Sequence, residues 1–196
     1  MSLYDFRRGL RWAGEYITIG GGEPTIHPDF KEMINIALDE KWSGNIESIT
    51  VIHNGKFAKM SKWLYNLTMD GVIDGHLSLD QYHDPIDQAV EDMWRRSSRI
   101  WNTTERREAQ PAGRAIEEVY GYSQEDEDYA ECVQDADCMC STQLIKPDGK
   151  IYQCGCEDAP VVGDLESGPD IWVSDCHRSP EFQHEVLSAD MDYLLV

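Results

Sequence analysis

Two kinds of hydrophobic pattern alternate along the first half of the chain. In the helical kind, apolar side chains recur at three- or four-residue spacing, as at Phe30, Met33, Ile34, Ala37 and Leu38. Helices are predicted on this basis for residues 3–13, 29–40, 56–69 and 85–100. Segments typical of strands lie between them, at residues 16–19, 46–53 and 72–79. Strands that recur roughly every 30 residues with helices between them predict an α/β fold with parallel strands.

The pattern changes in the second half of the chain. Residues 101–131 show no clear period, and residues 122–131 are acidic and rich in turn formers, which we interpret as a linker or a mobile lid. From Cys132 onward the chain is rich in cysteine, glycine, proline and aspartate. The sequence therefore predicts an α/β domain over residues 1–120 and a cysteine-rich appendage and tail over residues 121–196.

Charge and hydropathy narrow the range of partners. The chain has 17 basic and 37 acidic residues, which gives a net charge of −20. Such a charge repels nucleic-acid phosphates and anionic membranes, so we expect no membrane binding and no non-specific nucleic-acid binding. An acidic, solvated surface or a high-salt cytoplasm would each account for it. No apolar run approaches the ~18 residues of a membrane span, and the first residues lack a signal-peptide pattern. The prediction is a soluble, cytoplasmic protein.

A glycine-rich loop follows the first predicted strand. Gly20, Gly21 and Gly22 precede Glu23 and Pro24, and a predicted helix begins soon afterwards. Backbone amides without a neighbouring Cβ can approach a ligand closely, and Glu23 adds an acceptor beside them. A strand, a glycine-rich turn and a helix together present backbone donors to a small polar cofactor. The alternative is a glycine-rich turn that binds no ligand.

The GGEP segment at residues 21–24 resembles that of the radical S-adenosylmethionine (SAM) superfamily. Three more segments resemble family motifs in the same order: Ile52–Gly55, His76–Asp80 and Pro111–Ala115. The resemblance covers roughly residues 3–120. It implies a partial (β/α) barrel that binds SAM and takes part in radical chemistry on a small-molecule or peptide substrate.

The resemblance also implies a set of SAM-binding residues: Gly21, Gly22, Glu23, Pro24, Asn54, Ser78, Asp80 and Arg114. Most of them follow predicted strands directly, and ligands of parallel sheets lie at the carboxyl ends of strands. Carboxylates and hydroxyls there would accept hydrogen bonds from the ammonium group and the ribose, and Arg114 would donate to the SAM carboxylate. The alternatives are helix N-caps for Ser78 and Asp80 and a plain surface role for Arg114.

The chain departs from the family pattern in one respect. Radical SAM enzymes bind their catalytic [4Fe–4S] cluster through a CxxxCxxC loop, and no cysteine precedes Cys132 here. The short N-terminus would reflect a truncated or split gene, or a descendant that lost the chemistry. The chain alone is therefore not predicted to be a competent radical enzyme, although a partner chain could supply the loop.

Five of the six cysteines lie within residues 132–156, and clustered thiols in a cytoplasmic chain more often bind metal than form disulfides. Residues 144–146 and 150–152 flank a Pro-Asp-Gly turn, which predicts a β-hairpin with a two-residue loop, Asp148–Gly149, and 147 paired with 150. This pairing would gather four thiols: Cys138, Cys140, Cys154 and Cys156. Four thiolates suit an Fe–S cluster or tetrahedral zinc, and free buried thiols are the third reading.

This region resembles the SPASM or twitch appendage of radical SAM proteins, because Cys138, Gly149 and Cys154 fit its spacing, although its later CxxC is missing. The resemblance implies an auxiliary [4Fe–4S] cluster. The leading hypothesis is a radical SAM-type protein that binds SAM and this cluster. Its alternatives are a non-catalytic SAM- or nucleotide-binding or protein-interaction module with structural zinc or a cluster, and an α/β domain with zinc and no cofactor.

Overall fold

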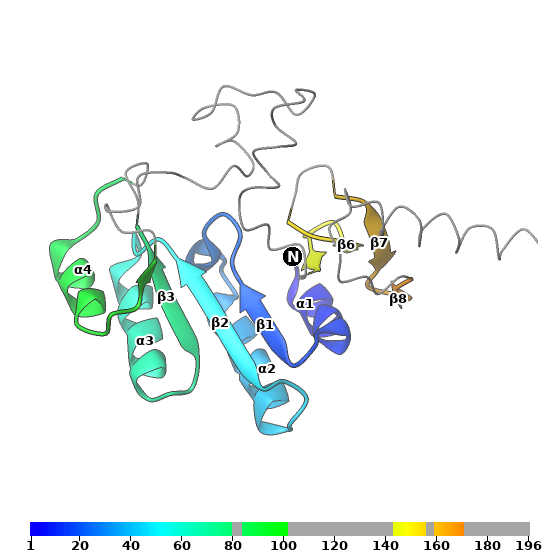
Figure 1. The fold of residues 1–196 in the computed structure, drawn as a ribbon, viewed down its shortest axis with the longest axis horizontal. Coiled ribbons are helices and arrows are strands. Elements are labelled where there is room, and N and C mark those ends of the chain that lie inside the picture. Colours follow the sequence, from blue (N-terminus) through cyan, green and yellow to red (C-terminus); the bar gives the residue numbers. More distant parts are fainter. Residues whose placement is uncertain (80–83, 102–142, 156–158, 171–196) are drawn as a thin grey trace, which may run out of the picture. The chain divides into compact units, whose positions relative to one another are not determined.

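A computed structural model describes residues 1–79, 84–101, 143–155 and 159–170 (Figure 1). The chain divides into two compact units. The parallel-sheet unit is Ala13–Glu108. The antiparallel-sheet unit combines Met1–Trp12 with Ala109–Val196. Five of the predicted site residues fall outside the described residues: Asp80, Arg114, Cys138, Cys140 and Cys156.

The parallel-sheet unit holds four strands in the order in which they occur along the chain: β1 (Tyr16–Ile19), β2 (Ser48–His53), β3 (Asp74–Ser78) and β4 (Ile100–Trp101). Every neighbouring pair is parallel. The arrowheads of β1, β2 and β3 therefore point to one edge of the sheet (Figure 1). The predicted α/β class with parallel strands is confirmed, and the described strands form an open sheet rather than a closed barrel.

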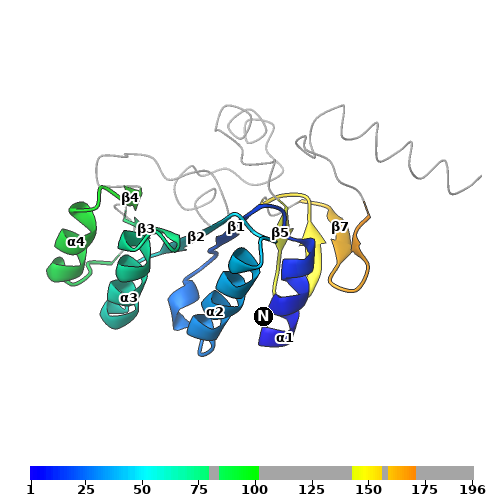
Figure 2. The same cartoon turned by 90° about the horizontal axis from the view of Figure 1, so that it is seen from below.

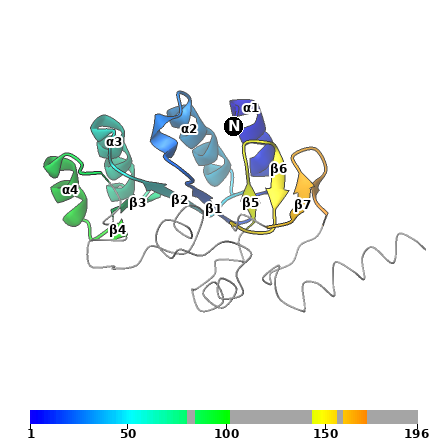
Figure 3. The same cartoon turned by 90° about the horizontal axis from the view of Figure 1, so that it is seen from above.

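Three helices cover one face of this sheet: α2 (Phe30–Trp42), α3 (Ala58–Met69) and α4 (Gln88–Arg95) (Figures 2 and 3). The strands and helices meet in an apolar core whose largest members are at most 1% exposed: Ile49, Val51, Leu77, Phe30, Ile34, Leu64 and Trp94. Burial of this surface is the main stabilising contribution to the unit. Along β2 every second residue is buried, which matches the alternation of side chains between the two faces of a strand.

Element boundaries differ from the predictions at a few ends. The helix predicted for residues 85–100 is shorter, because the Asp87 side chain accepts the Ala89 N–H at 2.9 Å and caps α4 there. The chain then turns at Ser98, which has a φ of 57°, before β4. The helix predicted for residues 3–13 is α1 (Leu3–Gly9) followed by a short 3₁₀ turn, η1 (Leu10–Trp12).

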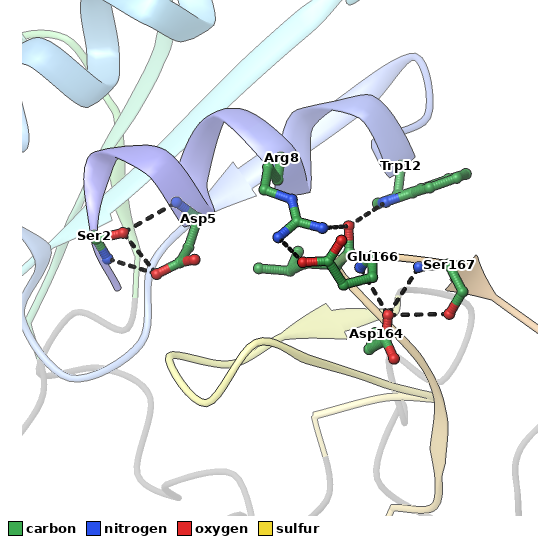
Figure 4. Close-up of polar contacts among 8 residues, drawn as sticks. Ser2, Asp5, Arg8, Trp12, Asp164, Glu166 and Ser167 are labelled. Carbon is green, nitrogen blue, oxygen red and sulfur yellow. Dashed lines mark hydrogen bonds and ion pairs between the residues drawn. The ribbon is translucent and has the colours of Figure 1, made fainter.

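The antiparallel-sheet unit contains four short strands in sequential order: β5 (Leu144–Ile145), β6 (Lys150–Tyr152), β7 (Val161–Asp164) and β8 (Gly168–Pro169). Helix α1 packs with this sheet, because Arg8 donates to the Leu165 carbonyl at 3.0 Å and forms an ion pair with Glu166 (Figure 4). The Trp12 indole N–H also donates to the Leu165 carbonyl, at 3.3 Å. The first twelve residues thus belong with the C-terminal unit, which a boundary near residue 120 does not anticipate.

The β5–β6 hairpin forms, but the predicted register is wrong by one residue. Leu144 pairs with Tyr152, and the Lys146 N–H donates to the Lys150 carbonyl at 3.1 Å. The loop therefore has three residues, 147–149, in which the Gly149 N–H donates to the Lys146 carbonyl at 3.1 Å and Gly149 adopts a φ of +81°. A one-residue shift changes which residues face each other along a hairpin. Three of the four cysteines lie outside the described residues, so their alignment stays a prediction.

Candidate functional site at the carboxyl ends of the parallel strands

Three of the segments singled out in the sequence lie along one edge of the parallel sheet. Residues 20–24 follow β1, Asn54 follows β2, and Ser78 ends β3. The strands are aligned so that Ile19 is opposite Val51 and His53 opposite Leu77. The structure thus brings together six of the eight predicted SAM-binding residues along this rim: Gly21, Gly22, Glu23, Pro24, Asn54 and Ser78. The other two, Asp80 and Arg114, lie outside the described residues.

The Glu23 carboxylate links two neighbouring loops of the rim. Its Oε1 accepts the Thr25 N–H at 3.0 Å and also the Thr25 hydroxyl. Its Oε2 accepts the Asn54 N–H at 2.7 Å, across to the loop that follows β2. An ionised carboxylate offers about four acceptor positions, so these three bonds leave about one for a ligand. Glu23 therefore combines a structural role with a remaining capacity to accept a hydrogen bond.

The turn after β2 has an acceptor for each of three successive backbone N–H groups. Asn54 donates to Glu23, Gly55 donates to His53 Nδ1 at 3.1 Å, and Lys56 donates to Asn54 Oδ1 at 3.0 Å. Gly55 has a φ of +76°, and an added Cβ would lie 2.7 Å from Leu77 Cδ1. Both the backbone conformation and the packing therefore require glycine at this position. The Asn54–Lys56 turn is held in one conformation by its neighbours.

His53 is a residue of the rim that the sequence analysis did not assign. Its side chain is on the buried face of β2 and the residue is 2% exposed. Burial lowers the pKa of His53 to about 4, and the negative charge of Glu23 opposes part of that shift. The ring is therefore neutral near pH 7. The available signal was a histidine at a position that the alternation along β2 marks as buried, directly before an Asn-Gly turn.

The glycine loop after β1 is open, in contrast to the glycines of the core. A Cβ added at Gly21 or Gly22 would meet no atom within 4 Å, and one at Gly20 would only reach the Cβ of Ile52 at 4.0 Å. Gly21 needs glycine for its φ of +98°, but no positive φ applies at Gly20 or Gly22. Packing among the described residues therefore does not account for glycine at positions 20 and 22.

An ion pair links the next two segments of the rim. Lys56, in the turn after β2, pairs with Asp84, which precedes α4. Ser78 is half-buried at the end of β3. The N-cap of α4 is Asp87, so Ser78 does not cap this helix.

A second polar cluster lies on β3 and near the start of β4. The Asp74 carboxylate pairs with Arg99 and lies 3.3 Å from Nε2 of His76. Burial lowers the pKa of His76. Asp74 and His76 occupy alternate positions of β3 and therefore share a face of the sheet.

The predicted metal ligands are largely outside the described residues: Cys138, Cys140 and Cys156. Cys154, the fourth, is buried beside Ala159 and Tyr152. Within the described ranges, no three His, Cys, Asp or Glu side chains are grouped so that they could hold a metal ion. The four-cysteine site thus stays a prediction.

Among the helices that the structure describes, none combines the length and the apolar composition needed to cross a membrane. Comparisons with protein-family models, with curated proteins and with solved structures each found no match. Function is therefore inferred from the residues and geometry of the rim.

Proposed function

We propose that the parallel-sheet unit binds SAM at the rim made by residues 20–24, Asn54 and Ser78. One observation carries the proposal: the chain places glycines at positions 20 and 22 although an alanine Cβ would fit there without a clash. Glycine lowers the stability of an ordered segment through its backbone entropy. Packing among the described residues does not require glycine at positions 20 and 22. A ligand that approaches the backbone where a Cβ would otherwise lie would explain it.

The chemistry of the rim suits the groups of SAM. The acceptor position left on Glu23 would receive the SAM ammonium group, and the N–H groups of the glycine loop would face its polar end. Ser78, with Asp80, would accept hydrogen bonds from the ribose hydroxyls, and Arg114 would donate to the carboxylate. SAM is a net cation, and a chain with a net charge of −20 attracts cations at long range.

The wider proposal is a radical SAM-type protein built on a partial (β/α) barrel. The cysteines at positions 138, 140, 154 and 156 would hold an auxiliary [4Fe–4S] cluster or zinc. If a partner chain supplies the catalytic cluster, the chemistry that this cluster brings is reductive cleavage of SAM, ahead of hydrogen abstraction from a small-molecule or peptide substrate.

The test is a calorimetric titration of the full chain with SAM, in the wild type and two variants. Gly22→Ala adds a methyl group in the open space of the loop. Gly14→Ala is the matched control, because its added Cβ also meets no atom within 4 Å and its φ is not positive.

We expect Gly22→Ala to weaken SAM binding by about tenfold or more, and Gly14→Ala to bind like the wild type. Neither variant should melt at a lower temperature than the wild type, because alanine fits both positions and loses less backbone entropy than glycine on folding. A wild-type chain that does not bind SAM, or equal affinities of the wild type and Gly22→Ala, would refute the proposal.

A non-catalytic module that binds SAM or a nucleotide is the second candidate. It needs only the glycine loop and the acceptor position that Glu23 keeps beside its bonds to Thr25 and Asn54, without a catalytic cluster. Iron and zinc analysis of anaerobically prepared protein, with an ultraviolet–visible spectrum, separates the two candidates. Zinc without iron favours the binding module, whereas formation of 5′-deoxyadenosine under reducing conditions favours the enzyme.

A further inference from the structure

His53 lies directly beneath the rim, at the last position of β2. Its imidazole packs against the indole of Trp94 in α4, with ring centroids 5.1 Å apart. The Trp94 N–H donates to the Ser61 hydroxyl of α3 at 2.8 Å. The histidine ring is therefore fixed by the two helices that cover this end of the sheet.

The two nitrogens of this ring have different surroundings. Nδ1 accepts the Gly55 N–H at 3.1 Å, so the neutral ring carries its proton on Nε2. Nε2 is buried, and among the described residues it has no hydrogen-bond partner. A buried donor without an acceptor lowers the stability of a fold. Packing alone would thus favour an apolar side chain at position 53. What the histidine contributes is the hydrogen bond that its Nδ1 accepts from the Gly55 N–H.

That bond is the second of three hydrogen bonds donated by successive N–H groups of the turn, those of Asn54, Gly55 and Lys56. The bond from the Gly55 N–H is buried, and Leu77 and Ile86 lie so close to Gly55 that an added Cβ would be 2.7 Å and 3.0 Å from them. Water therefore cannot easily replace the imidazole as acceptor. Without Nδ1, the peptide group between Asn54 and Gly55 would have to rotate to find another partner. Such a rotation would also disturb the preceding Asn54 N–H, which holds Oε2 of Glu23.

We propose that His53 is a positioning residue of the ligand-binding rim: by accepting the Gly55 N–H, it fixes the Asn54–Lys56 turn and, through that turn, the Glu23 carboxylate. The part of this inference that concerns the ligand rests on the proposed SAM site. The part that concerns the turn can be measured without a ligand.

The experiment compares the wild-type full chain with His53→Asn and His53→Leu. The Asn side chain can place Oδ1 near the position of Nδ1 and keep the acceptor, whereas Leu keeps the apolar packing and removes it. His53→Gln is a second variant without an acceptor at that position, for use if His53→Leu does not fold. The readouts are SAM affinity by calorimetry and the exchange rate of the Gly55 amide by NMR.

We expect His53→Leu to bind SAM about tenfold more weakly and to exchange the Gly55 amide about tenfold faster. His53→Asn should stay near the wild type in both readouts. A merely structural role would give both variants the same affinity loss, which would overturn the inference, and so would a wild-type affinity in His53→Leu.

The two readouts also separate this inference from the proposed function. A wild-type chain that does not bind SAM refutes the SAM site and, with it, the ligand role of His53. In that case faster Gly55 exchange in His53→Leu alone still supports the role of His53 in holding the turn, and unchanged exchange overturns it.

Discussion

The rim of the parallel-sheet unit and the loop after β7 in the antiparallel-sheet unit are both held by a carboxylate, but their surroundings differ. In each, one carboxylate accepts hydrogen bonds from several backbone N–H groups. Asp164 accepts the Glu166 N–H at 2.7 Å and the Ser167 N–H at 2.8 Å, as Glu23 accepts those of Thr25 and Asn54 (Figure 4). A side chain that orders a loop does not by itself indicate a ligand site.

The glycines beside these carboxylates distinguish the two loops. Gly168 has a φ of +86°, and an added Cβ would lie 2.6 Å from the Trp12 ring, so the unit's own packing requires glycine there. Gly22 has open space instead. The β7–β8 segment is thus packed against Trp12 of η1, whereas the described residues leave the loop after β1 open.

The largest effect is expected for Gly168→Ala. The substitution combines a clash with Trp12 and a strained backbone, so it should lower the free energy of unfolding of the antiparallel-sheet unit by about 3 kcal/mol. Gly155→Ala, in the same unit, is the control because its Cβ would meet no atom within 4 Å. Urea unfolding followed by tryptophan fluorescence measures both. Equal stability of the two variants would contradict the distinction between the glycines.

Removal of each carboxylate should separate structure from binding. We expect Glu23→Ala to lower the free energy of unfolding of the parallel-sheet unit by about 2 kcal/mol, because it leaves the N–H groups of Thr25 and Asn54 without an acceptor. It should also abolish SAM binding. Asp164→Ala should destabilise only its own unit and leave SAM affinity unchanged, and a loss of affinity there would count against the comparison. Calorimetric titration and urea unfolding read out the two effects.

The two units should also lose stability in different pH ranges. The pKa of His53 is lowered by burial to about 4 in the folded chain, so below its ordinary value of 6.5 the unfolded chain binds more protons. The parallel-sheet unit should therefore lose about 2 kcal/mol of stability between pH 7 and pH 5. His53→Leu should lose about 2 kcal/mol less over this range, and the loss that remains belongs to groups such as His76, whose pKa burial also lowers. An equal pH slope in the wild type and the variant would show that His53 does not cause the difference.

Asp164 acts in the same direction as His53 but at a lower pH. Hydrogen bonds, first that from the Ser167 N–H, lower the pKa of this carboxyl below 3.8. Its contribution is present above pH 3.8 and is lost as the pH falls through the lower folded value. The antiparallel-sheet unit should therefore keep this contribution at pH 5.

Local patterns predicted the elements of the parallel-sheet unit well, because helix and strand periods depend on neighbours in sequence. The register of the β5–β6 hairpin was missed, since a Pro-Asp-Gly segment fits both a two-residue and a three-residue loop. The two-residue loop would need a positive φ at Asp148, which this residue does not adopt. The docking of α1 was missed for another reason: Arg8 and Glu166 are 158 residues apart, beyond any local pattern.

At the rim, the sequence identified the glycine loop, Glu23 and Asn54 through motif and strand position. From the sequence, Glu23 was predicted only as an acceptor for a ligand. Its structural bonds to Thr25 and to the Asn54 N–H were missed, because they depend on the spacing of two adjacent strands. The same holds for His53, whose partner Gly55 is close in sequence but whose burial depends on Trp94 in α4.

The most direct test of the SAM site is an NMR titration of the ¹⁵N-labelled full chain with SAM, followed at the backbone amides. The account predicts saturable shifts at Gly20–Glu23 and Asn54–Lys56, and no comparable shifts at Asp164–Ser167. Absence of shifts at the glycine loop, or shifts confined to the loop after β7, would contradict it.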